Sequence, residues 1–188
     1  MAEIVLVRHG QTEWSAAGRH TSYTDLGLTA DGERQARALA ERLAGRRFVA
    51  VLCSPRIRAR HTAQLAGLTV TELDEDLVEW NYGRYEGLTT VEIRRDRPGW
   101  WVWSDGCPDG ESPPEVAARM DRVLGRVAPL LEQGDVALVG HAHSLRMAGA
   151  RWVGLEPAGG GLLRLDTGTL STLGHERERP VVLSWNAP

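Results

Sequence analysis

The sequence has no lysine, and all 22 of its basic residues are arginine. A compositional bias of the genome accounts for this better than function does, so no single arginine is informative without its context. Cysteine is also scarce, since the chain has only Cys53 and Cys107, and these form no CxxC pair. This scarcity excludes a disulfide framework and favours a reducing compartment.

Excess charge and long apolar runs are missing as well. The net charge is -3, which gives no reason to expect a nucleic-acid partner. Only a few apolar residues precede Arg8, and they are too few for a signal peptide or a membrane span. We therefore expect a soluble cytoplasmic protein that binds no membrane.

With 188 residues, of which 42% are hydrophobic, the chain has the size and composition of one globular domain. Short apolar runs alternate with stretches of helical periodicity, and this alternation predicts an α/β fold. We expect a three-layer sandwich, with a mainly parallel central sheet and helices on both faces. Residues 1–188 then form a single domain, in which residues 74–114 are an excursion over the carboxyl ends of the strands and cover the active site.

Several helix starts are marked by capping residues. Thr29 precedes a helical pattern, and Thr89 with Glu92 and Ser112 with Glu115 have the spacing of capping boxes. Further apolar segments are expected to be strands that complete the sheet. They comprise residues 69–73, 162–165, 169–173 and 181–185.

Three apolar runs end in residues suited to phosphate chemistry. The runs are residues 4–7, 48–53 and 136–139. The first leads into Arg8 and His9, the second into Ser54 and then Arg58, and the third into His141. Ser54, which is followed by a proline, is expected to cap the helix whose first turn carries Arg58. Because the carboxyl ends of parallel strands meet at one edge of a sheet, these side chains should converge there on a phosphoryl group, whose oxygens match arginine forks.

His9 is the candidate nucleophile of this site. Neighbouring positive charge disfavours protonation of its imidazole and leaves a lone pair for in-line attack on phosphorus, while a backbone carbonyl could hold the other ring nitrogen. A protonated His141 would neutralise charge in the transition state. Glu79 is the candidate acid that protonates the leaving alkoxide, although one of the acids at positions 74–76 could replace it.

These residues belong to an ordered set of motifs that covers nearly the whole chain. The motifs are residues 8–14 (RHGQTEW), residues 24–32 (TDLGLTADG), residues 54–59 (SPRIRA), Glu79 with Gly83 and Glu86-Gly87, residues 110–112 (GES) and Gly140-His141. The set resembles the successive motifs of the histidine phosphatase superfamily, in its phosphoglycerate mutase-like branch. The resemblance implies that His9 is phosphorylated and that Glu79 donates the proton. It also places Arg8, Arg58 and His141 in the phosphate pocket, and it implies a phosphohistidine intermediate without a metal or other cofactor.

Two departures from the family pattern bear on the substrate. Ser15 follows Trp14 where the mutases of the family usually have asparagine. The chain also ends at Pro188, without the longer tail that mutases use to shield the phosphoenzyme from water. Both departures favour hydrolysis, and the run from Glu79 to Gly87 resembles the same group of acid and sugar-bisphosphate phosphatases. The resemblance therefore implies a metal-independent phosphomonoester hydrolase with a small-molecule substrate.

The alcohol part of the substrate is expected to contact residues around the phosphate pocket. The candidates for these contacts are Trp14, Ser15, His20, Thr21, Tyr23, Tyr82, Ala142 and His143. The three tryptophans Trp100, Trp101 and Trp103 form either a core beneath the excursion or an apolar rim around the substrate, and the sequence does not decide between these two.

Other interpretations stay open at this point. A phosphoglycerate mutase would store the same phosphohistidine, and a catalytically inactive relative would bind phosphate or phosphopeptides without turnover. His141 and His143 could ligate a metal, but no third ligand stands at a suitable spacing, and the arginines would repel a cation. An edge strand or the excursion could also support a homodimer.

Overall fold

The computed structural model describes residues 2–188 and has a six-stranded sheet at its centre, in the order β3-β2-β4-β1-β5-β6. The strands are β1 (Ile4–Arg8), β2 (Phe48–Cys53), β3 (Glu72–Leu73), β4 (Asp135–Gly140), β5 (Leu170–Glu176) and β6 (Arg179–Ala187). The first four run parallel, and β5 pairs antiparallel with both β1 and β6. The expected α/β fold with a mainly parallel sheet is confirmed.

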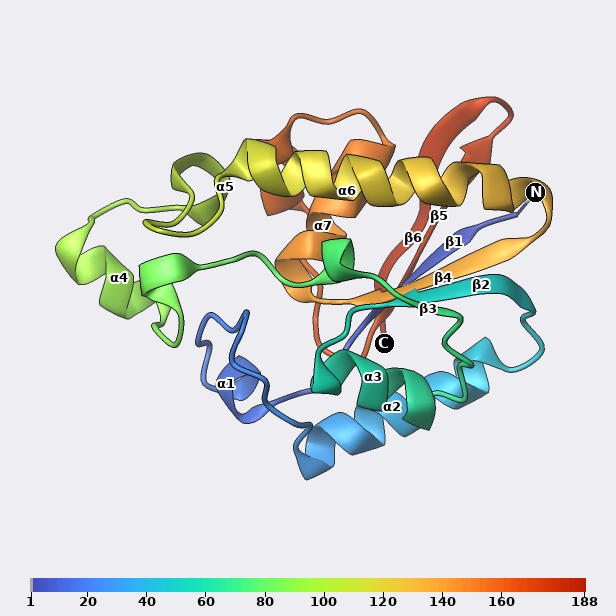
Figure 1. Cartoon of the computed structure of the whole chain (residues 1–188), viewed down its shortest axis with the longest axis horizontal. Coiled ribbons are helices and arrows are strands. Elements are labelled where there is room, and N and C mark those ends of the chain that lie inside the picture. Colours follow the sequence, from blue (N-terminus) through green and yellow to red (C-terminus); the bar gives the residue numbers. More distant parts are fainter. Residues whose placement is uncertain (1) are drawn as a thin grey trace.

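Helices cover both faces of this sheet (Figure 1), so the expected three layers are present. α2 (Ala30–Leu43) and α3 (Ile57–Leu65) pack on one face, and α6 (Pro113–Val127) and α7 (Ala142–Trp152) pack on the other. Three short helices lie to one side, beyond the carboxyl ends of the parallel strands: α1 (Glu13–Ala16), α4 (Thr90–Asp96) and α5 (Val102–Asp105). Short 3-10 helices occupy Glu75–Leu77, Gly83–Tyr85, Ala128–Glu132 and Pro157–Leu162. No helix formed by residues 2–188 combines the length and apolar character that crossing a membrane requires.

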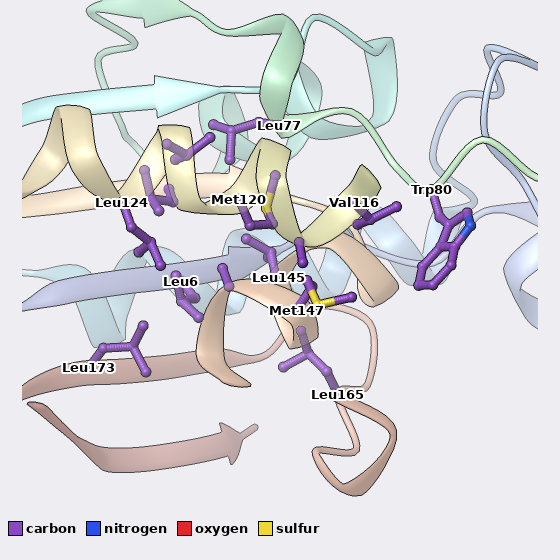
Figure 2. Packing of buried hydrophobic residues seen from close by; sticks show 14 of the residues in the cluster. Leu6, Leu77, Trp80, Val116, Met120, Leu124, Leu145, Met147, Leu165 and Leu173 are labelled. Carbon is purple, nitrogen blue, oxygen red and sulfur yellow. The ribbon is translucent and has the colours of Figure 1, made fainter. Parts of the chain in front are cut away.

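Alternation of the strand side chains produces two cores, one on each face of the sheet. In β1, Ile4 and Leu6 face α6 and α7, whereas Val5 and Val7 face α2 and α3. All four side chains are at most 1% exposed, because successive residues of a strand point to opposite faces. Figure 2 shows the larger core, in which Met120 of α6 packs against the sheet.

The predicted helix caps are present. Thr29 Oγ1 accepts a hydrogen bond at 3.1 Å from the backbone N–H three residues later, at the start of α2. Glu92 Oε2 accepts from the Thr89 N–H at 2.8 Å, and Glu115 Oε2 accepts from the Ser112 N–H at the same distance. These bonds satisfy backbone donors that the first turn of a helix leaves free.

The expected start of α3 is wrong. Ser54 does not cap this helix, which begins at Ile57. Its hydroxyl instead lies 2.7 Å from His141 Nε2. Ser54 has the sequence signature of a helix cap, but its side chain binds His141 at the edge of the sheet.

Two of the expected closing strands also differ from the structure. Of residues 69–73, only Glu72–Leu73 form a strand. Residues 162–165 form no strand, and the Leu165 carbonyl accepts a hydrogen bond from the Arg8 side chain rather than from a neighbouring strand. This segment belongs to the wall of the site instead of to the sheet.

Ion pairs tie the excursion at residues 74–114 to α6. Arg119 is 7% exposed and forms two bonds of 2.9 Å to the Glu111 carboxylate. It also donates to the Val78 carbonyl at 2.9 Å, directly before Glu79. The carboxylates at positions 74 and 76 pair with arginines of the same helix, so they hold the excursion in place.

Tryptophans form the core beneath this excursion. Trp100 and Trp103 are each 2% exposed, whereas Trp101 is 40% exposed. The first two are therefore core residues, and only the third reaches the surface.

Candidate active site

Three strands in register bring the predicted residues to one edge of the sheet. β1 and β4 pair with Arg8 opposite Gly140, and the His9 N–H continues this ladder with a 3.1 Å bond to the Gly140 carbonyl. β2 pairs with the other side of β4 and ends directly before Ser54. His9 and His141 thus become neighbours, with their ring centroids 5.1 Å apart.

The His9 ring is held in one tautomer. Its Nδ1 lies 2.7 Å from the Gly10 carbonyl oxygen. Because a carbonyl can only accept, Nδ1 carries the proton and Nε2 keeps a free lone pair. Burial lowers the pKa of His9 well below its ordinary value, and the charges of Arg58 and Arg8 lower it further. The imidazole is therefore neutral and nucleophilic.

His141 is held in the opposite tautomer. Arg58 Nε donates to its Nδ1 at 3.2 Å, so Nε2 carries the proton and donates to Ser54 Oγ at 2.7 Å. Burial lowers the pKa of His141 well below its ordinary value, and the charge of Arg58 acts in the same direction. In the free site His141 is thus a neutral donor.

Arg58 binds the loop at residues 21–24 as well as His141. The side chain is fully buried and donates to the backbone carbonyls of Thr21 at 3.3 Å, Ser22 at 3.1 Å and Thr24 at 3.1 Å. Together with its bond to His141, these contacts engage most of its five N–H groups. Arg58 therefore orders both the loop and His141.

Three further arginines contribute positive charge to the pocket itself. Arg8 donates to the Leu165 carbonyl, and its buried Nε has no hydrogen-bond partner within residues 2–188. A buried donor without a partner is costly, and a phosphate oxygen would satisfy it. Arg19 and Arg146 also line the pocket, and Arg146 lies over the ring of Trp103 at 4.7 Å.

Glu79 belongs to the excursion, and its side chain lies against the first turn of α7 and is 4% exposed. Its Oε1 accepts from the backbone N–H groups of Ser144 and of its own neighbour Trp80, each at 2.9 Å, and its Oε2 accepts from that of His143 at 3.0 Å. These backbone donors at the start of α7 fix the position of the carboxyl group. These bonds hold the side chain against the pocket, which it lines together with Arg8 and His9.

Arg8, His9 and Glu79 line a pocket of 270 Å³, whereas Arg58 and His141, which are both fully buried, do not line it. Three larger and more open hollows, of 410, 710 and 920 Å³, lie elsewhere on the surface and contain none of the predicted site residues. Within residues 2–188, no group of three or more His, Cys, Asp or Glu side chains is arranged to hold a metal ion. Predicted residues suited to phosphate chemistry therefore line the 270 Å³ pocket and none of the larger hollows.

Most of the predicted substrate-binding residues line this pocket. They are Ser15, His20, Thr21, Tyr82, Ala142 and His143. Tyr23 does not, since it is 57% exposed and lies beneath the guanidinium of Arg56. Trp14 does not line it either, because its ring packs against Gly87.

A cluster of rings forms one wall of the pocket. The Tyr82 hydroxyl lies 2.6 Å from His143 Nδ1, and the ring centroids of Tyr82 and His20 are 4.7 Å apart. Burial lowers the pKa of His143 well below its ordinary value, and the charges of Arg146 and His20 lower it further. This wall is therefore uncharged.

Six lining residues escaped the sequence analysis. They are Thr12, Gly18, Arg19, Thr90, Arg146 and Leu165. Arg146 could have been found, because it follows His143 by three residues in a helix and so shares its face. Arg19 could not, since the loop that carries it has no periodic pattern.

The buried histidines predict that acid destabilises the fold. Burial is the main cause that lowers the pKa values of His9, His20, His141 and His143. Below the unfolded pKa of about 6.5 the unfolded chain takes up these protons and the folded chain does not, so stability is lost as pH falls from that value toward the lowered pKa values. Each histidine contributes up to about 1.4 kcal/mol per pH unit.

The free energy of unfolding in urea, measured at pH 7.5 and at pH 5.5, reports this loss. These two pH values are chosen because few carboxylates titrate between them. The variant His143→Gln should flatten the dependence. Equal stability of the native protein at both pH values would contradict the prediction.

Comparison with known proteins places the whole chain in one group. A family profile described as histidine phosphatase superfamily, branch 1, matches residues 4–188. The chain is 44% identical to an acid phosphatase of Mycobacterium tuberculosis, and the alignment covers 92% of this chain and 86% of that protein. It is 35% identical to a sedoheptulose 1,7-bisphosphatase of Saccharomyces cerevisiae, with 80% of this chain and 67% of the other covered.

A solved structure has nearly the same fold. It is the product of an open reading frame of Mycobacterium tuberculosis, and it superposes with a TM-score of 0.96 at 39% identity. The match covers 99% of this chain and 97% of the other. The likeness thus includes the sheet edge and the excursion that together form the pocket.

Proposed function

Because this chain belongs to the histidine phosphatase superfamily and is a phosphoric monoester hydrolase, we propose that its reaction is a double displacement through His9. The observation that carries this proposal is the geometry of His9. Its Nδ1–H is bound to the Gly10 carbonyl at 2.7 Å, and its ring lines the phosphate-sized, arginine-rich pocket. Nε2 therefore keeps a lone pair for attack on phosphorus.

In the first step His9 Nε2 forms a bond to phosphorus while the bond from phosphorus to the alcohol oxygen breaks. The leaving oxygen takes a proton from Glu79. Arg8, whose buried Nε lacks a partner among the described residues, binds a phosphoryl oxygen. The neutral Nε2–H of His141 turns from Ser54 to another oxygen of the group.

In the second step a water oxygen attacks phosphorus and the bond to His9 Nε2 breaks. Glu79 takes a proton from this water, which returns the acid to its starting state. Inorganic phosphate leaves, and the neutral His9 is restored. The substrate is a small phosphate ester, since the pocket measures 270 Å³.

A hydrolysis assay tests this function. We expect release of inorganic phosphate from an aryl phosphate at the same rate with and without a chelator, and no exchange of phosphate between phosphoglycerates. Loss of activity with the chelator would contradict the mechanism. Phosphate exchange without hydrolysis would show that the protein is a mutase. If phosphate is released as expected, a panel of sugar mono- and bisphosphates ranks the substrates.

A further inference from the structure

Two side chains outside the pocket hold the peptide groups on either side of Gly10. The Gly10 N–H donates to Thr62 Oγ1 at 3.0 Å, and the Gln11 N–H donates to Gln35 Oε1 at 2.8 Å. Gln35 lies in α2 and Thr62 in α3. Neither residue lines the pocket, so neither is expected to touch a substrate.

The bond from Gln35 acts on the carbonyl that selects the tautomer of His9. The Gly10 carbonyl and the Gln11 N–H belong to one planar peptide group. Fixing the N–H therefore also fixes the direction of the carbonyl, which accepts from His9 Nδ1 at 2.7 Å. A hydrogen bond at the N–H end also polarises the group and makes its oxygen a better acceptor.

Thr62 controls the preceding peptide group, between His9 and Gly10. Its side chain is fully buried. The hydroxyl accepts from the Gly10 N–H and donates to the Arg58 carbonyl at 2.8 Å. Its single proton is thus directed to Arg58, and its lone pairs face the residue after the nucleophile.

Gly10 needs such external support because its own conformation is weakly restricted. A Cβ at this position would lie 2.2 Å from the Gly32 carbonyl oxygen, so the start of α2 can pack here only against a glycine. Glycine samples more backbone conformations than any other residue. Hydrogen bonds from neighbouring helices must therefore set the orientation of its two peptide groups.

We propose that Thr62 and Gln35 are positioning residues that keep His9 in the Nδ1–H tautomer, with Nε2 free to attack phosphorus. This inference rests on the proposed role of His9 as the nucleophile. It assigns a function to two side chains that lie behind the site and act only through the backbone of Gly10.

The test compares Thr62→Val and Gln35→Met, which keep the size of each side chain but remove the acceptor. We expect kcat for an aryl phosphate to fall roughly 10- to 100-fold with little change in KM, because small misplacements of a reacting atom have effects of this size. Thr62→Ser, which keeps the hydroxyl, should restore most of the rate. In spectra of ¹⁵N-histidine-labelled protein, the variants should show a share of the Nε2–H tautomer of His9 that the native protein lacks.

Thr71→Val is the matched control. Thr71 Oγ1 also bridges a backbone N–H and a carbonyl, both of Val51, at 2.9 and 3.1 Å, but it lies away from the pocket. Unchanged His9 tautomer and kcat in Thr62→Val and Gln35→Met, or losses no larger than those of Thr71→Val, would overturn the inference. Retained activity in His9→Ala would instead overturn the proposed function, so the two failures are distinguishable.

Discussion

The His9→Ala variant is expected to lose roughly 10⁴-fold or more in kcat for an aryl phosphate, since loss of a covalent nucleophile has effects of this order. His9 is 5% exposed and lines the pocket beside Arg8. The variant should still bind phosphate or vanadate, because the pocket arginines Arg8, Arg19 and Arg146 are retained.

Two measurements check this result. Steady-state kinetics give the loss of kcat, and rapid quenching with labelled substrate shows whether an acid-labile phosphoenzyme forms. His61→Ala is a suitable control, because His61 lies on α3 beside a different surface hollow. Activity of His9→Ala within tenfold of the native protein, or a phosphoenzyme that survives the substitution, would exclude His9 as the nucleophile.

The residues at the strand ends were predictable, because their placement depends on the few residues directly before them. An apolar run such as residues 4–7 has to be a buried strand, and the polar residue that follows it must appear at the sheet edge. The same argument brings His141 next to His9, as the 5.1 Å between their ring centroids confirms. The caps at Thr89 and Ser112 were predictable for the same reason, since each bond spans only three residues.

Interactions between distant segments were not predictable. Ser54 has the local pattern of a helix cap, but a bond to a residue 87 positions away takes its hydroxyl. Residues 162–165 have the composition of a strand, yet the Leu165 carbonyl accepts from Arg8. The charge state of His141 depends on burial that only the packed structure defines, so the sequence left it open.

Glu79 was partly predictable: the sequence named it as a candidate, but only contacts between distant segments distinguish it from the other acids nearby. The sequence drew attention to it as an acid in an acidic stretch, and it left the acids at positions 74–76 as substitutes. The structure separates them, because Asp74 and Asp76 pair with arginines of α6 whereas Glu79 lines the pocket. The Glu79 carboxylate is bound by three backbone N–H groups at 2.9 to 3.0 Å, so its position is set by the backbone.

The Glu79→Gln variant is expected to lose roughly 10²- to 10⁴-fold in kcat/KM for an alkyl phosphate, the usual contribution of a positioned acid. This ratio reports the steps up to release of the alcohol and not the later hydrolysis of phosphohistidine, in which Glu79 acts as the base. Glutamine keeps the size of the side chain and one acceptor oxygen, but its NH2 group takes the place of the second oxygen and does not supply the proton. A nitrophenolate leaves without protonation, so the loss for a nitrophenyl phosphate should be much smaller than that for an alkyl phosphate. Rates for both esters, measured in the native protein and in the variant, provide this comparison.

The ratio of the two losses carries the argument, because a variant that is merely misfolded slows both esters equally. Asp74→Asn serves as control, since Asp74 is a carboxylate 7% exposed that binds Arg126 outside the pocket. This variant should lose stability while keeping the native ratio of rates. If Glu79→Gln lowers kcat/KM for both esters by the same factor, or if Asp74→Asn shows the dependence on the leaving group instead, Glu79 is not the acid that protonates the departing alcohol.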